Sequence, residues 1–502
     1  MEICAPALAY LTFQDLQPTV LQSGRIELLQ HAFYQLYSRF DVQDLDPDTA
    51  KQLKQVGDGF LTVFADISSL PEFPATCPLG SKPIQILINW LGLPPAFSHL
   101  QTAACLSLGN LSRSDESSTA LLPDVQDSLV KILSRAVLPT PSQDVTPKTP
   151  AIPLQLTHAA LSFVKNLAIA HPNKPLLGAV LFDPANPLLP RLWTSTRTQP
   201  QLQFASISLA RLLLVNCPAN VHLICTPLPD TTPSTTINNS PKSNLALLTN
   251  TAASADEDPI KIEAARAASL VCRALHSPAS QDPTITPILS PSWTWPPTAS
   301  PSPSPSADEE TNPPLTRFYT SHAQTTLVPS LTHLLTQPRF PALRSETIFV
   351  LALMSRDPAG ARLDLQVLQS DTNGAGPQAR WQAIASAISD SDAGLAAIFS
   401  RQVEEVHEED DEHHHQPGDE EKKKEEVTVE RLSLEPQALL NPQAQKQQPA
   451  RAAEMDRENA MVLVAELLRQ FPDELASLRR PLEELLNKGG ELVVRDRERE
   501  HK

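Results

Sequence analysis

Glycine and aromatic residues are scarce in this chain of 502 residues, which has 14 glycines and only 5% Phe, Trp and Tyr. β-sandwiches and barrels need aromatic strands and Gly-containing turns, so this composition argues against them and favours helices. No apolar run approaches the roughly 18 residues of a membrane span. No signal peptide is visible at the start, where Glu2 replaces a basic region. We therefore expect a cytoplasmic (cytosolic) protein without membrane insertion.

Cysteines in a CxxC arrangement are also missing. The six cysteines lie mostly within apolar helical runs and are interpreted as reduced, buried core residues: Cys4, Cys77, Cys105, Cys217, Cys225 and Cys272. Three adjacent histidines, 413–415, stand in a charged block without fixed geometry, so we expect no metal site there. The sequence predicts no cofactor.

Catalytic motifs are absent as well. The chain contains no GxxxxGK[ST] phosphate loop, no GxGxxG after a strand, no HExxH and no GxSxG. Scattered Asp, His and Ser residues occur, but no pattern brings them together. We therefore expect a protein that acts by binding, with no catalytic site of its own.

Basic residues are outnumbered, and the net charge is −17 with a pI near 5.2. A nucleic-acid-binding protein usually has a basic surface, so the sequence predicts no nucleic-acid partner. The acidic balance fits a basic protein partner, and it equally fits an ordinary soluble protein without one.

Helical periodicity is present from the first hundred residues onward. Apolar residues recur at spacings of three and four in 26–36, 60–67 and 84–91. We interpret residues 1–99 as an N-terminal helical region. From residue 100 a similar helix of about 15 residues, rich in Ala, Leu and Ser, recurs along the chain. Its copies are 101–112, 155–170, 201–216, 262–276, 343–356 and 378–390, with second apolar helices such as 125–136 and 327–335 between them.

Small residues on several faces of these helices suit a helix with neighbours on both sides, as in a repeat stack. The predicted fold is an all-α, armadillo/HEAT-like right-handed superhelical solenoid over 100–395. Pro/Ser/Thr-rich stretches near 138–153, 226–258 and 278–314 are predicted to be flexible inserts. Residues 396–450 are expected to form an acidic disordered linker, and 451–502 a C-terminal helical segment of one or two docked or partner-binding helices.

Several of the repeat helices resemble those of the small-GTPase GDP-dissociation stimulator (SmgGDS) family. The sequence HAALSFVKNLAI at 158–169 is similar to the family's HAALSALRNLAI, and LGNLSRSD at 108–115 resembles its GNFARND segment. Weaker likenesses follow in the same order at Gln203-Phe204 with Arg211, in 263–273, and in 346–353. The resemblance covers about residues 100–356, and the long inserts depart from the family's compact repeats.

This resemblance implies an armadillo protein that regulates small GTPases. Its partners would be Rho- or Ras-type GTPases, including prenylated forms with basic C-terminal tails. A concave groove would hold the GTPase, and the protein would promote GDP release (guanine-nucleotide exchange) or chaperone the prenylated form. The acidic block 404–426 would either receive a basic tail or act only as a solvated linker.

The residues expected to bind the partner lie on the groove-lining helices: Asn110, Arg113, Lys165, Asn166, Arg211, Glu263, Arg266, Arg273 and Glu346. Asn110 and Asn166 would contact a partner or bond neighbouring helix ends. Arg266 and Arg273, two turns apart, would line the groove or form intrachain salt bridges. Arg113 would read a partner loop or sit at a solvated helix end. Lys165 stands where the family usually has Arg, and it lacks the bidentate geometry of Arg.

The alternative function is a general armadillo scaffold or adaptor that binds extended peptide segments of other proteins. Import receptors of this architecture present ordered Trp/Asn arrays. Among the six copies, only Trp381 supplies a Trp. This argues against an import receptor and does not exclude other scaffold proteins.

Overall fold

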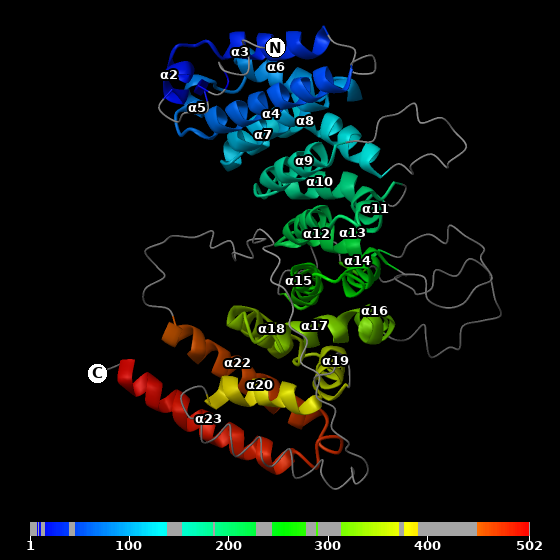
Figure 1. Cartoon of the computed structure of the whole chain (residues 1–502). Helices are drawn as coiled ribbons and strands as arrows, with labels where there is room; N and C mark the ends of the chain where they lie inside the picture. Colours follow the sequence, from blue (N-terminus) through cyan, green and yellow to red (C-terminus); the bar gives the residue numbers. More distant parts are fainter. Residues whose placement is uncertain are drawn as a thin grey trace, which may run out of the picture. The chain divides into compact units, whose positions relative to one another are not determined.

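The structure is a computed structural model of the whole chain. It describes residues 8, 10–11, 16–39, 46–137, 153–183, 186–226, 243–277, 288–289, 313–370, 376–389 and 449–500 (Figure 1). Every regular element within these ranges is a helix or a helical turn, and no β-strand occurs, which confirms the all-helical prediction. None of the helices so described is both long and apolar enough to cross a membrane. Residues 1–224 and 225–502 form two compact units.

The first unit consists of helices joined mostly by short turns. Its helices are α2 (Gln17–Gln22), α3 (Ile26–Ser38), α4 (Pro47–Ser69), α5 (Phe73–Thr76), α6 (Lys82–Leu91), η2 (Pro95–Phe97), α7 (Ser98–Leu111), α8 (Asp115–Ala136), α9 (Leu154–Leu167), α10 (Asn173–Leu181), α11 (Leu188–Ser195), α12 (Pro200–Leu214) and most of α13 (Pro218–Cys225). Three of the predicted repeat copies are therefore confirmed as helices α7, α9 and α12.

Helices α4, α7, α9 and α12 form a row in which each contacts the next. Two hydrogen bonds give their direction. Asn110, near the end of α7, donates to the Ala65 carbonyl near the end of α4. Asn166, near the end of α9, donates to the Gly109 carbonyl near the end of α7. Since like ends meet, α4, α7 and α9 run parallel, as similar units stacked side by side require.

Glutamine side chains of the row helices α7 and α12 bond the ends of the neighbouring helices α6 and α11. Gln101 donates to the carbonyls of Leu91 (3.1 Å) and Leu93 (2.7 Å), where α6 ends. Gln203 donates to the Trp193 carbonyl in the last turn of α11 at 3.2 Å. The last four carbonyls of a helix have no intrahelical donor, so these buried amides satisfy groups that would otherwise be unpaired.

The second unit repeats this organisation. Its helices are α14 (Asn244–Ala253), α15 (Asp258–Leu275), α16 (Pro314–His322), the π-helical turn η4 (Ala323–Leu327), α17 (Val328–Leu335), α18 (Pro341–Met354), α19 (Pro358–Gln369), α20 (Pro377–Ser389), α22 (Pro449–Gln470) and α23 (Arg479–Glu500). The other three repeat copies are confirmed as α15, α18 and α20.

Helices α15, α18 and α22 form the second row, again with neighbours in contact. Arg266 of α15 bonds Glu346 near the start of α18. Ser345 near the start of α18 bonds Asp456 of α22. Gln470 at the end of α22 donates to the Ser355 carbonyl just after α18. These pairs show that α22 runs parallel to α18, so the C-terminal segment is docked in the row (Figure 1).

The insert predicted at 226–258 is partly wrong, because helix α14 lies inside it. The polar stretch ends at Ser243, whose Oγ accepts from the Ala246 N–H at 3.1 Å and caps the helix. Leu245 and Leu248 are both 0% exposed, and this burial stabilises a segment whose composition resembles a loop. Residues 138–152, 278–287, 290–312 and 390–448, which include the acidic block, lie outside the described residues.

Small residues are buried in the row helices, as their patterning predicts. In α15, Ala264, Ala265, Ala267 and Ala268 are all at most 3% exposed. Helices on both sides approach closely because these side chains are short. The five cysteines within the described ranges are buried free thiols, as expected, and Cys4 lies outside them.

Candidate partner-binding site

The nine predicted partner-binding residues fall into two groups, one in each unit. The first unit holds Asn110, Arg113, Lys165, Asn166 and Arg211, on or just after α7, α9 and α12. The second unit holds Glu263, Arg266, Arg273 and Glu346, on α15 and α18. Eight of the nine therefore lie on row helices, and Arg113 lies two residues after the end of α7.

The two asparagines bond neighbouring helix ends, the second of the two alternatives for them. Asn110 Nδ2 donates to Ser68 Oγ at 2.9 Å and to the Ala65 carbonyl at 3.2 Å. Asn166 Nδ2 donates to the Gly109 carbonyl at 2.9 Å. Both amide nitrogens thus hold consecutive row helices together. Contact of these residues with a partner stays a prediction.

The three cations of the first group differ in their surroundings. Arg113 is exposed and donates to Asn110 Oδ1 at 2.7 Å. Lys165 and Arg211 are half-buried in the last turns of α9 and α12, where positive charge complements the partial negative charge of a helix C-terminus. The helix termini therefore give a structural reason for the positive charge at Lys165 and Arg211 that does not involve a partner.

On α15 and α18, three predicted residues come together. Arg266 lies 3.9 Å from Glu263 on its own helix and 3.4 Å from Glu346 on the next. The side chains of Glu263, Arg266 and Glu346 are 6%, 18% and 55% exposed. Arg266 links the two helices through Glu346, and the exposed Glu346 carboxylate keeps lone pairs for a partner. Intrachain pairing, one of the two alternatives for Arg266, is therefore present.

Arg273 makes a different contact at the far end of the same face. Its guanidinium lies over the ring of Phe349 on α18, 5.4 Å from the ring centroid. Phe349 is 36% exposed and Arg273 is also exposed, so this cation–aromatic pair faces solvent. The sequence analysis did not include Phe349 among the partner-binding residues. Its position three residues after Glu346 could have indicated it, because this spacing places both side chains on one side of the helix.

The face formed by Glu263, Arg266, Arg273, Glu346 and Phe349 is called here the α15–α18 face. Helix α22 borders it, because Ser345 bonds Asp456 there. The neighbouring Met455 is 55% exposed. The region thus combines charged groups with two exposed apolar side chains, Phe349 and Met455.

Among the described residues, no group of three or more His, Cys, Asp and Glu side chains is placed to hold a metal ion. The three adjacent histidines at 413–415 lie outside those residues. The chemistry of the α15–α18 face is that of ion pairing and aromatic contact.

No protein-family model matches this chain, and a search of curated proteins finds no match to it. The resemblance described above therefore depends on the quoted helices alone.

Proposed function

We propose that this chain is an armadillo-type regulator of small GTPases, as its resemblance to the SmgGDS family implies. It would bind a Rho- or Ras-type GTPase and promote GDP release or escort the prenylated form. The order of its helices supports an armadillo arrangement. Two short helices and a longer row helix follow one another as α10, α11 and α12, and α16, α17 and α18 follow in the same order, with the π-helical turn η4 joining α16 directly to α17. The parallel row helices are the further property that such repeats require.

The observation that carries the proposal is the α15–α18 face. Arg is one of the residue types that most often dominate binding energy at protein interfaces, and Phe is enriched there. Here Arg273 of α15 and Phe349 of α18 form an exposed pair, on two helices that the Arg266–Glu346 ion pair also links. Because the Arg273 guanidinium already lies over the Phe349 ring, it would lose less side-chain entropy on binding than an arginine without such a contact.

The proposed activity requires no catalytic residues in the chain. A protein that binds the nucleotide-free GTPase more tightly than the GDP-bound form shifts the equilibrium towards release. By linkage, GDP weakens the complex by the same factor by which the complex weakens GDP binding. The excess of acidic residues, with a net charge of −17, would favour encounter with a GTPase that has a basic tail.

The test is release of a fluorescent GDP analogue from purified Rho- and Ras-type GTPases, prenylated and unprenylated, with a pull-down of each. Faster release would support exchange activity, and binding without faster release would support the escort role. If none of them binds, the proposal is wrong and the scaffold alternative takes its place.

A charge-reversal variant locates the surface. Arg273→Glu combined with Phe349→Ala should weaken GTPase binding by about tenfold or more, since loss of an interface anchor costs about 2 kcal/mol. Arg339→Glu, an exposed residue between α17 and α18, is the charge-matched control. Equal affinities of the two variants and the unaltered protein would exclude the α15–α18 face as the GTPase site.

A further inference from the structure

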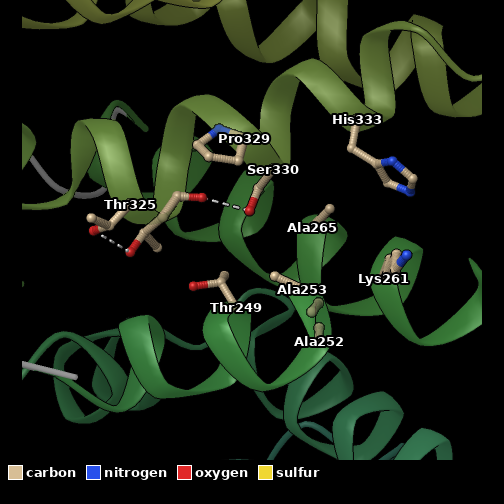
Figure 2. Close-up of a pocket in the computed structure, with 11 residues that line it drawn as sticks. Thr249, Ala252, Ala253, Lys261, Ala265, Thr325, Pro329, Ser330 and His333 are labelled. Carbon is tan, nitrogen blue, oxygen red and sulfur yellow. Dashed lines mark hydrogen bonds between the residues drawn. The ribbon is translucent and has the colours of Figure 1, made fainter. Parts of the chain in front are cut away.

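A cavity lies in the second unit, apart from the residues of the α15–α18 face. Its volume is about 370 Å³; it is open on one side and lined by residues of α14, α15, η4 and α17 (Figure 2). Small-molecule sites in proteins range from roughly 300 to 1,000 Å³, so this one fits a small organic ligand. None of the predicted partner-binding residues lines it.

The cavity is not filled by side chains because the residues of one wall are alanines, whose side chains are single methyl groups. Ala252 and Ala253 of α14 and Ala264 and Ala265 of α15 form this wall, called here the alanine wall. Opposite it, the chain passes through the π-helical turn η4 before α17 begins. A π-helical turn is rare and occurs often at functional sites, because it widens the helix and redirects its side chains.

One end of the cavity is cationic. Lys261 lines it and makes no ion pair with any of the described residues. Beside it, His333 Nε2 lies 3.7 Å from Asp258 Oδ1 and 3.1 Å from Gln337 Nε2. Burial lowers the pKa of His333, so its imidazole is mainly neutral at neutral pH and can donate or accept a hydrogen bond. Lys261 therefore supplies the positive charge that this end offers to a ligand.

The other end is lined by hydroxyl groups. Ser330 Oγ donates to the Thr326 carbonyl at 2.6 Å, and Thr249 Oγ1 donates to the Leu245 carbonyl at 3.1 Å. Because their protons are already donated, these oxygens present lone pairs and accept from a ligand donor. Figure 2 shows Thr249, Thr325 and Ser330 on the side away from Lys261 and His333, with the labelled alanines between.

We propose that this cavity binds a small organic anion that has a short apolar chain and a hydroxyl group. The anionic end would pair with Lys261 and bond His333. The chain would lie against the alanine wall, and the hydroxyl would donate to Ser330 or Thr249. This arrangement matches each part of the ligand to a feature of the lining.

The test is isothermal titration calorimetry of the full chain with 6-hydroxyhexanoate, compared with 1,6-hexanediol. We expect saturable binding of the anion at one site, and the diol to bind about tenfold more weakly because it lacks the charge that Lys261 pairs. Absence of saturable binding, or equal binding of anion and diol, would overturn the proposal.

Two variants assign the binding to the cavity. Ala253→Leu fills it from an exposed position on α14 and should abolish binding, and Lys261→Met should weaken it about five- to tenfold. The controls are Asn250→Leu, which adds the same side chain on the exposed side of α14, and Lys488→Met on α23. Circular dichroism checks that all four fold. Binding that survives both cavity variants would refute the assignment, whatever the outcome of the GTPase assays.

Discussion

Asp364 offers a sharp test of how this fold depends on pH. Its side chain on α19 is 0% exposed, and neither carboxyl oxygen has a hydrogen-bond partner among the described residues. Burial raises the pKa of Asp364 well above its ordinary value, so the folded protein keeps this carboxyl protonated to higher pH than the unfolded chain does. The charge of an ionised Asp364 would also raise the pKa values of the nearby Cys272 and Tyr319.

The sign of the effect follows from linkage. In the unfolded chain the carboxyl ionises near its ordinary pKa of about 3.9, so above that pH the folded state binds more protons. Stability is therefore present at low pH and is lost as pH rises towards the folded pKa. While Asp364 stays protonated in the fold, each pH unit lowers the free energy of unfolding by about 1.4 kcal/mol.

Asp364→Asn removes this dependence with almost no change in shape. Between about pH 5 and about pH 7 the unaltered protein should lose up to about 2.8 kcal/mol relative to the variant, two pH units at the slope above. Urea unfolding followed by circular dichroism at several pH values measures this difference. Asp473→Asn, at an exposed carboxylate, is the control and should show the pH profile of the unaltered protein. Parallel profiles for Asp364→Asn and the unaltered protein would refute the reasoning.

Three further substitutions test the packing by urea unfolding. Gly360→Ala should destabilise by about 1–3 kcal/mol, because the added methyl would overlap the backbone carbonyl of Met354. Arg457→Met should cost roughly 2–4 kcal/mol and speed hydrogen exchange in α22 and α23, since Arg457 is 3% exposed and pairs with Asp496 at 2.5 Å. Asn166→Ala should cost about 1 kcal/mol through the lost bond to the end of α7.

Matched controls separate these causes from general effects of substitution. Gly490→Ala in α23, where a methyl would meet only Met461 at 3.9 Å, should stabilise by about 0.5–1 kcal/mol. Arg479→Met breaks only the exposed pair with Glu483 and should stay within about 0.5 kcal/mol of the unaltered protein. If Gly360→Ala stabilises the protein as Gly490→Ala does, Gly360 does not lie as close to the Met354 carbonyl as the structure shows. If Arg457→Met behaves like Arg479→Met, the buried arginine does not hold the C-terminal helices.

Local pattern alone identified the six repeat helices, because an apolar stripe at spacings of three and four is a property of neighbouring residues. The same reasoning failed for α14. Its segment follows a Pro/Ser/Thr-rich stretch, and composition averaged over 226–258 concealed the buried side chains of Leu245 and Leu248.

The candidate site was partly visible in sequence. Glu263, Arg266 and Arg273 share a helix, so their common face followed from spacing. Glu346 and Phe349 lie about 80 residues further on, and only the packing of α18 against α15 brings them to that face. The cavity lined by Lys261 and His333 had no sequence signal, because its lining comes from four separate elements.

The sequence by itself therefore determined the helical class, the positions of the row helices and the residue types on their polar sides. Each depends on periodicity within a single segment. The tertiary structure decided which polar side chains hold the fold together and which face solvent. It turned Asn110 and Asn166 into links between helices, and it left Arg273 and Phe349 exposed. Such roles depend on distances between segments that are far apart in the chain, and no local pattern encodes these distances.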